Sequence, residues 1–222
     1  MTICRTVHAV PRPDGRVRGA GIAIGMGVLA VGLGGAAQGA PRGPDPCRIR
    51  VQTFLSPAGE PFHADPAAPP PVAGWFAQAD RDRDGRLTPA EVRADAVRFF
   101  ATVDTDGNGE IIPDELATYE RGVPDISTYR DGPPDRRSAR GTPYGTPVGG
   151  ARYALANVPN PIAAADIDLN RATTRAELSN AAGKLFVGIA RGRAALALAD
   201  LPATPQALML ATCAARAKRV RR

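Results

Sequence analysis

Two stretches of twelve residues decide how this chain folds. Residues 80–91 read Asp-Arg-Asp-Arg-Asp-Gly-Arg-Leu-Thr-Pro-Ala-Glu, and residues 104–115 read Asp-Thr-Asp-Gly-Asn-Gly-Glu-Ile-Ile-Pro-Asp-Glu. Each stretch carries a carboxylate or amide at positions 1, 3 and 5, glycine at position 6 and glutamate at position 12. Alternate residues of a curling loop direct their oxygens to one point, and a hard cation such as calcium takes six to eight oxygens. The two stretches therefore predict cation-binding loops.

The position of each residue in these loops predicts how it binds the ion. Position 7 offers its backbone carbonyl, and the glutamate at position 12 is long enough to reach back and bind with both oxygens. Position 9 of the second loop is Ile112, so we expect water to fill that direction. The predicted metal ligands are Asp80, Asp82, Asp84, Arg86, Thr88 and Glu91 in the first loop, and Asp104, Asp106, Asn108, Glu110 and Glu115 in the second.

Both stretches match the calcium loop of the EF-hand family, D-x-[DN]-x-[DN]-G-x₅-E. Gly85 and Gly109 stand where that loop must turn with φ > 0. The chain thus resembles bacterial exported EF-hand proteins. The resemblance implies calcium binding by a helical pair that orders or opens with the metal. In such pairs the residues at position 8, here Leu87 and Ile111, meet in a short two-stranded ladder. The alternative is a pair of solvated, metal-free turns.

Helix signals surround both loops. Thr88 and Glu91 form a T-x-x-E capping box with Pro89 at the first helical position, and Pro113 is placed equally well in the second loop. Apolar residues recur at helical spacing over 89–103, which predicts a helix there. Asp80 and Asp104 lie 24 residues apart, so this one helix must both leave the first loop and enter the second.

A third loop and a relic of a fourth follow at the same spacing. Residues 166–177 begin Asp-Ile-Asp-Leu-Asn and end in Glu, but Arg171 replaces the glycine at position 6, at a cost of roughly 1 kcal/mol. Calcium binding there is left open. Residues 190–201 have Asp200 as their only acidic residue, so we expect a metal-free loop kept for packing, or an ordinary helix over 185–200. The candidate ligands of the third loop are Asp166, Asp168, Asn170 and Glu177.

The sequence predicts an all-α, EF-hand-like fold of two loop–helix–loop units. The 24 glycines and 22 prolines exclude one large core spanning the whole chain. Residues 152–158 are a candidate for docking on a helical unit. The expected organisation is a Pro-rich linker over 40–71, an EF-hand pair over 72–121, a flexible linker over 122–157, a degenerate EF-hand-like pair over 158–215 and a basic tail over 216–222.

The N-terminus predicts export. Residues 1–18 carry four arginines, residues 19–37 carry no charge, and Ala37-Gln38-Gly39 fits a small-x-small cleavage site. We therefore predict a signal peptide over 1–39, a periplasmic or secreted protein, and no stable membrane span after cleavage. An uncleaved anchor is the alternative. Export leaves Cys47 and Cys213 as an even pair in an oxidising compartment, and whether they form a disulfide stays open.

Composition narrows the function further. The net charge of +6 is too mild to indicate nucleic-acid binding, and the basic tail is read as solvated, with an anionic-surface contact as the alternative. The only two histidines, His8 and His63, exclude H-E-x-x-H zinc sites and argue against a Ser-His-Asp triad. We expect a non-enzymatic calcium-binding protein with a buffering, sensing or structural role, holding two calcium ions and leaving a third site open. The alternative is a calcium-dependent adaptor for an unknown protein partner, which exposed Trp75, Phe76 and Phe99 would favour.

Overall fold

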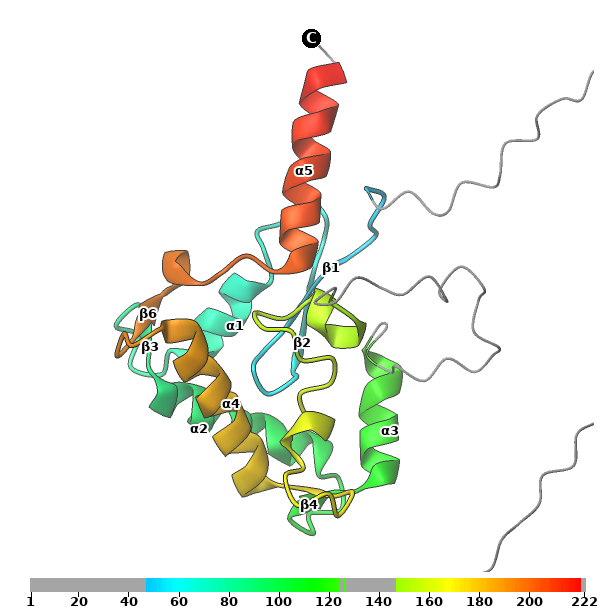
Figure 1. Cartoon of the computed structure of the whole chain (residues 1–222), viewed down its shortest axis with the longest axis vertical. Coiled ribbons are helices and arrows are strands. Elements are labelled where there is room, and N and C mark those ends of the chain that lie inside the picture. The colour runs from blue at the N-terminus through cyan, green and yellow to red at the C-terminus, as the bar shows by residue number, and fades with distance from the viewer. Residues whose placement is uncertain (1–46, 124–125, 127–146, 221–222) are drawn as a thin grey trace, which may run out of the picture. The chain divides into compact units, whose positions relative to one another are not determined.

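A computed structural model describes residues 47–123, 126 and 147–220 (Figure 1). All of them belong to one compact unit, 43–222. The predicted signal peptide and much of the predicted linker over 122–157 lie outside the described residues. Within the part that is described, no helix has both the length and the apolar character that crossing a membrane requires.

The helices begin where the sequence signals place them. The hydroxyl of Thr88 accepts the Glu91 N–H at 3.2 Å, while the Glu91 carboxylate accepts the Thr88 N–H at 2.9 Å. Thr174 and Glu177 repeat this capping box at the next loop. The helix predicted over 89–103 is confirmed. The helices are α1 (Val72–Ala79), α2 (Pro89–Val103), α3 (Pro113–Gly122), α4 (Arg175–Ala190) and α5 (Pro205–Val220).

Short elements connect these helices. The 3₁₀ helices are η2 (Gly149–Arg152), η3 (Ala163–Ala165) and η4 (Leu198–Asp200). The strands are β1 (Gln52–Leu55), β2 (Pro61–Ala64), β3 (Arg86–Leu87), β4 (Glu110–Ile111), β5 (Thr173–Thr174) and β6 (Leu196–Ala197).

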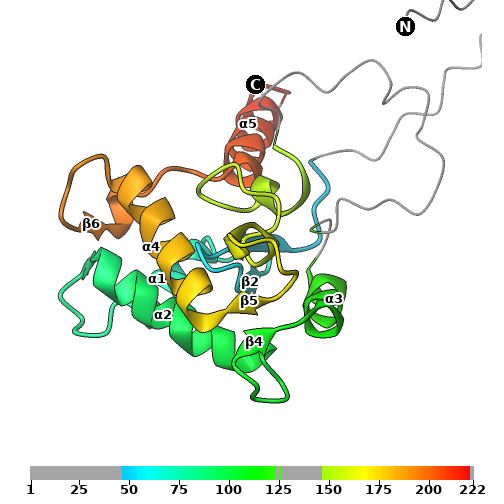
Figure 2. The same cartoon turned by 60° about the horizontal axis from the view of Figure 1, so that its bottom comes forward.

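The loops pair crosswise between the two halves of the chain. Leu87 of β3 faces Leu196 of β6, and Ile111 of β4 faces Thr173 of β5. The expected ladder between Leu87 and Ile111 is therefore wrong. The reason is length: α2 has 15 residues and spans about 22 Å, so the loops at its two ends cannot meet. Each finds its partner at the nearer end of α4, which runs beside α2 (Figure 2).

One hydrophobic core lies between the two predicted EF-hand units. It contains Val92, Ala96, Phe99 and Phe100 from α2 together with Leu178, Ala182 and Phe186 from α4. The two units therefore form a single body, a point that the sequence left open. Crosswise strand pairing at both ends of the α2–α4 pair completes the arrangement.

A β-hairpin adds to this helical core, which is why the fold is not strictly all-α. β1 and β2 pair antiparallel with Phe54 opposite Phe62, and Gly59 at φ 99° makes the turn between them. Phe54 is 1% exposed and its ring centroid lies 5.4 Å from that of Trp75. The linker expected over 40–71 is thus corrected over 52–64, where the chain forms this hairpin, while residues 40–46 lie outside the described part. Gly59 lies in the turn, Pro61 begins β2, and all four residues of β1 are buried.

A buried carboxylate ties the hairpin to the helices. Asp95 of α2 accepts hydrogen bonds from Trp75 Nε1 at 2.9 Å and from Arg98 Nε at 3.0 Å. Arg98 also pairs with Glu60, in the hairpin turn. Because Asp95 is 3% exposed, these partners are needed to offset the cost of burying its charge.

Part of the predicted linker over 122–157 is also packed. Leu55 donates its N–H to the Tyr153 carbonyl at 3.0 Å and forms a parallel bridge with Ala154. Leu55 and Ala154 are buried together with Val123 and Ile126 in a small hydrophobic cluster. Leu155 packs against the helical core, as the suggested docking of 152–158 on a helical unit predicts, while Tyr153 and Ala154 contact the hairpin strand β1. The packed residues correct the flexible-linker prediction at these positions.

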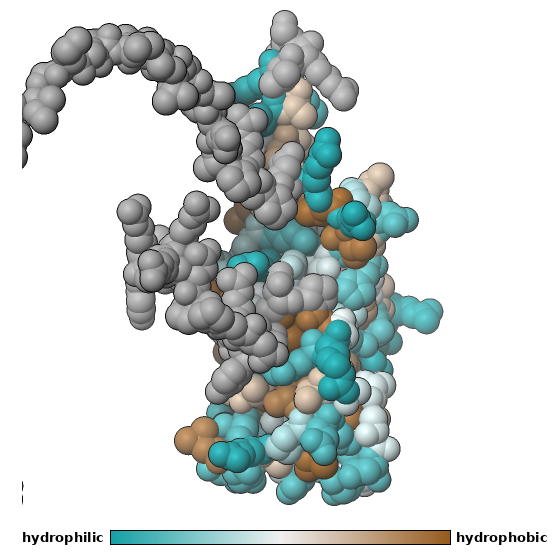
Figure 3. Space-filling model, turned by 90° about the vertical axis from the view of Figure 1, so that its right-hand side faces the viewer, coloured by the Kyte–Doolittle hydropathy of each residue, from teal (hydrophilic) through white to brown (hydrophobic). Residues whose placement is uncertain are grey.

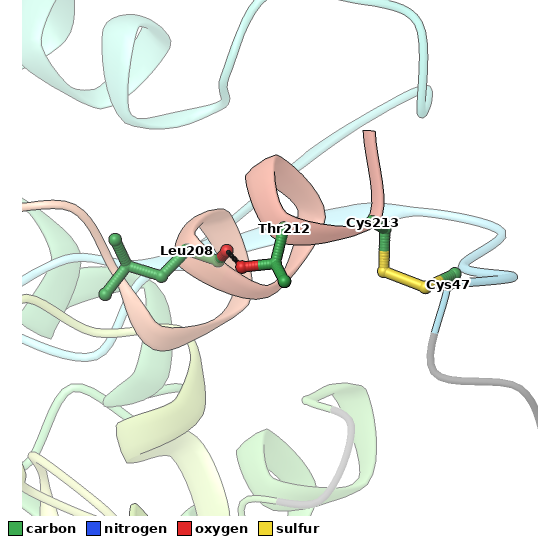
Figure 4. The surroundings of a disulfide bond; sticks show 4 residues. All are labelled: Cys47, Leu208, Thr212 and Cys213. Atoms are coloured by element: carbon green, nitrogen blue, oxygen red, sulfur yellow. Dashed lines mark hydrogen bonds between the residues drawn. A yellow bond between two sulfur atoms is a disulfide. The ribbon is translucent and has the colours of Figure 1, made fainter. Parts of the chain in front are cut away.

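A disulfide joins Cys47 to Cys213, as shown in Figure 4. It attaches the start of the described chain to α5 across a sequence separation of 166 residues. The pairing that the cysteine count left open is therefore present. Residues 214–219 of α5 are exposed and include Arg216, Lys218 and Arg219 from the predicted basic tail.

Candidate metal centres

Three clusters of acidic side chains lie in the loops that the sequence identified. In each cluster the candidate ligand atoms all lie within 4.8 Å of one another. In Figure 3 the lower end of the molecule, where β4 and its loop lie, is mostly hydrophilic. The clusters are Asp80, Asp82 and Asp84 in loop 1 (80–91), Asp104, Asp106 and Glu115 in loop 2 (104–115), and Asp166, Asp168 and Glu177 in loop 3 (166–177).

In loop 2, Asp104 is the C-cap residue directly after α2, and its carboxylate points into the loop. Oδ2 accepts the Gly109 N–H at 3.1 Å, which closes the loop around it. Oδ1 is buried and has no hydrogen-bond partner within the described part of the chain. A buried, ionised oxygen without a partner carries a desolvation cost that a bound cation removes.

Glu115 closes loop 2 from the other side. Oε1 accepts the Thr105 N–H at 2.6 Å and Oε2 accepts the Ile112 N–H at 3.1 Å. Burial alone would raise the pKa of this carboxyl, but hydrogen bonds from Thr105, Ile112 and Asp106 outweigh it and hold the pKa below its ordinary value. Glu115 is therefore ionised and suited to a cation.

Loop 1 repeats this geometry. Asp80 Oδ2 accepts the Gly85 N–H at 3.0 Å, while Oδ1 is buried and has no hydrogen-bond partner within the described residues. Glu91 Oε1 accepts the Arg81 N–H at 3.1 Å, as Glu115 does with Thr105. The donor sets of loops 1 and 2 thus fit calcium, because hard carboxylate oxygens converge on a point that the loop itself leaves unsatisfied.

The remaining predicted ligands shape the loops. Asp82, Asp84, Asp106 and Asn108 each accept a backbone N–H two residues ahead, which curls the chain around the site. Arg86 and Glu110 start the strands β3 and β4 with exposed side chains, as expected for residues that offer a carbonyl. Thr88 differs, because its hydroxyl is engaged with Glu91 and serves as the cap of α2.

The loop backbone also requires a positive φ at a second position, which the sequence motif does not specify. Position 4 of each loop, like position 6, has positive φ: 59° at Arg83, 71° at Gly107 and 61° at Leu169. Only loop 2 has glycine at both positions. Gly107, at position 4 of loop 2, was the one residue in the sequence that indicated this requirement. Loop 1 has one strained residue, and loop 3 has two, Leu169 and Arg171 at φ 72°.

Loop 3 has the same form but satisfies itself. Asp166 Oδ1 accepts the Asn170 N–H at 3.2 Å, and Oδ2 accepts the Arg171 N–H at 2.9 Å. Hydrogen bonds from Thr174 lead the effects that hold the pKa of Glu177 below its ordinary value. Loop 3 therefore brings its carboxylates together, yet lacks the unsatisfied buried oxygen of loops 1 and 2.

Residues 191–200 form a loop, which was one of the two alternatives predicted for this stretch. α4 ends at Ala190, and β6 then pairs with β3, so the alternative of a continuous helix over 185–200 is wrong. Leu196 is fully buried in the common core, which agrees with a role in packing. Its only acidic residue, Asp200, ends the short helix η4.

Comparison with known protein families adds one match. The family described as EF hand matches residues 72–94, which cover α1, loop 1 and the first turns of α2. No curated protein and no solved structure matches the chain.

Proposed function

We propose, from the premise that this chain carries an EF-hand calcium-binding domain, that it acts as an exported, non-enzymatic calcium-binding protein. Calcium would be held by the side chains of Asp80, Asp82, Asp84 and Glu91 in loop 1. Asp104, Asp106, Asn108 and Glu115 would hold it in loop 2. The bound ion would supply the positive charge that organises each loop.

The carrying observation is the pair of buried, unsatisfied oxygens, Oδ1 of Asp80 and Oδ1 of Asp104. A buried polar atom without a hydrogen-bond partner destabilises the folded state by about 1–3 kcal/mol, and a charged one by more. Both aspartates occupy position 1 of their loop. Asp80 offers an oxygen within 4.8 Å of ligand atoms of Asp82 and Asp84, and Asp104 offers one within 4.8 Å of ligand atoms of Asp106 and Glu115. A divalent cation bound in each loop would remove this cost at the aspartate of that loop. Loop 3 is proposed as a weaker third site, because Asp166 already has partners for both oxygens.

A buffering or structural role is favoured over a calcium-opened adaptor. Trp75, Phe76 and Phe99 are 0%, 6% and 5% exposed and belong to the core that α2 and α4 share. Exposing them would also break the hydrogen bond from Trp75 to Asp95. Opening is thus costly in this fold.

Export is supported by two independent features. The signal-like N-terminus is one, and the disulfide between Cys47 and Cys213 is the other. Structural disulfides persist in oxidising compartments such as the bacterial periplasm and the extracellular space.

Glu115→Gln tests the site assignment against a matched change, Glu110→Gln, in the same loop. Glu115 faces the cluster, whereas Glu110 has an exposed side chain and offers only its carbonyl. We expect Glu115→Gln to lower calcium affinity at loop 2 at least about tenfold, or 1.4 kcal/mol. Glu110→Gln should change it less than about twofold. Calorimetric titration of the full chain measures both.

The corresponding change in loop 1 completes the test. Glu91→Gln should remove most of the affinity of loop 1 and leave loop 2 unaffected. If the double variant Glu91→Gln, Glu115→Gln titrates with calcium as the unchanged chain does, the proposed sites are wrong.

A further inference from the structure

The strand register fixes which residues of the fourth loop correspond to those of the others. At the far end of α2, Ile111 at position 8 of loop 2 faces Thr173 at position 8 of loop 3. By the same rule Leu196, which faces Leu87, stands at position 8 of the fourth loop. Asp200 therefore stands at position 12, where the other three loops have glutamate.

Asp200 makes the backbone contact that a position-12 carboxylate makes elsewhere. Its Oδ2 accepts the Ala197 N–H at 3.1 Å. In loop 1, Glu91 Oε2 accepts the Thr88 N–H at 2.9 Å, three residues back along the chain. One oxygen of Asp200 is thus used as in a metal-binding loop, and the other is paired with Arg193.

The fourth loop begins without an acidic residue. The C-cap residue that follows the preceding helix is Asp80, Asp104 and Asp166 in loops 1 to 3, whereas Arg191 is the C-cap of α4. The loop then runs over 191–200, two residues shorter than the others. It has no carboxylates at its start with which to gather a cation.

A guanidinium lies where a cation is needed. Arg193 Nη1 lies 3.0 Å from Asp200 Oδ1, and Arg193 Nε donates to the carbonyl of Ala190 at 3.3 Å. The positive charge therefore joins the position-12 carboxylate to the last turn of the entering helix. A cation is also favourable there because the C-terminal end of a helix carries partial negative charge.

We propose that Arg193 is a positioning residue that takes the place of a metal ion in the fourth loop, and so orders loop 1 for calcium binding. The inference rests on the proposed calcium function. β6 borders β3 of loop 1, and Arg86 Nη2 donates to the carbonyl of Ala195 at 3.3 Å. Loop 1 therefore pairs with a loop whose cation is permanent and covalently attached.

This arrangement makes the two ends of the molecule unequal. Loop 2 pairs through β4 and β5 with loop 3, whose acidic cluster forms no ion pair with a basic side chain within the described part of the chain. Loop 1 should bind calcium with no dependence on a second ion. Loop 2 should bind with an affinity that depends on whether loop 3 is filled.

Arg193→Met tests the inference, with Arg191→Met as the matched control. Both remove one positive charge from the same loop, but only Arg193 forms the ion pair with Asp200. The side chains of Arg193 and Asp200 are 48% and 41% exposed, so water screens this ion pair and its loss should have only a small effect on calcium affinity. Arg193→Met should weaken calcium binding at loop 1 by about two- to fivefold and leave binding at loop 2 unchanged.

The amides of Gly85 and Gly109 report the two sites separately, because each donates to the position-1 aspartate of its own loop. Their NMR signals are followed during calcium titration of the full chain. Amide hydrogen exchange in the metal-free chain is the second readout. Protection in β3 and β6 should fall for Arg193→Met and recover in part for Arg193→Lys.

Equal behaviour of Arg193→Met and Arg191→Met in both readouts would overturn the inference. Failure of the proposed function looks different: the unchanged chain would show no calcium response at either glycine. The exchange measurement contains no calcium, so it judges the role of Arg193 in either case.

Discussion

Asp80 and Asp104 each keep one carboxylate oxygen buried and unsatisfied, whereas Asp166 does not. This difference separates three loops with similar sequences. A second difference lies in the backbone, where loop 2 places glycine at both positions of positive φ and loop 3 at neither. Ligand chemistry and backbone strain therefore both place loop 3 last.

Arg171→Gly tests the contribution of strain at loop 3. Arg171 adopts φ 72°, which costs a non-glycine residue about 1–2 kcal/mol. Removing that cost should raise calcium affinity at loop 3 about fivefold, equivalent to about 1 kcal/mol. Calorimetric titration in the Glu91→Gln, Glu115→Gln background isolates this loop.

Ala172→Gly is the control for this change. It introduces glycine at the next residue, which does not have positive φ, so affinity should not rise. If both variants behave alike, strain at position 6 does not limit loop 3.

At the scale of single residues the sequence was informative, because each ligand position has its own chemical requirement. The acidic clusters form where the motif places them. Position 4 was missed because the motif leaves it free, and the structure shows that only its backbone is constrained. Thr88 was predicted both as a metal ligand and as the cap of α2, and its hydrogen bonds with Glu91 confirm the cap.

Among the elements, α2 and the hairpin contrast in how far the sequence specifies them. α2 carries its own start signal and an apolar stripe, and both are local. The hairpin has neither. Phe54 is buried because Trp75 of α1 and the rest of the core accept it, and such tertiary packing leaves no local signature.

Phe54→Ala measures whether the hairpin belongs to the core. Its side chain is 1% exposed, so truncation should lower the free energy of unfolding by about 3–5 kcal/mol. Val51→Ala, three residues away at a side chain that is 45% exposed, should cost no more than about 0.5 kcal/mol. Urea unfolding of the two variants provides the comparison, and equal midpoints would show that the hairpin is peripheral.

Across the whole molecule, the crosswise pairing of loops is the feature that sequence could least predict. β3 to β6 have two residues each, too few for their pattern to select a partner. The packing of α2 on α4 selects it, by bringing loop 1 to the fourth loop and loop 2 to loop 3. The same packing merges two predicted units into one body.

The central claim is that loops 1 and 2 of this body bind calcium. Calorimetric titration of the metal-free full chain with Ca²⁺, and then with Mg²⁺, tests it most directly. We expect at least two sites that prefer calcium, with a weaker third if loop 3 fills. An absence of heat up to millimolar calcium, the range in which extracellular modules bind, would contradict it.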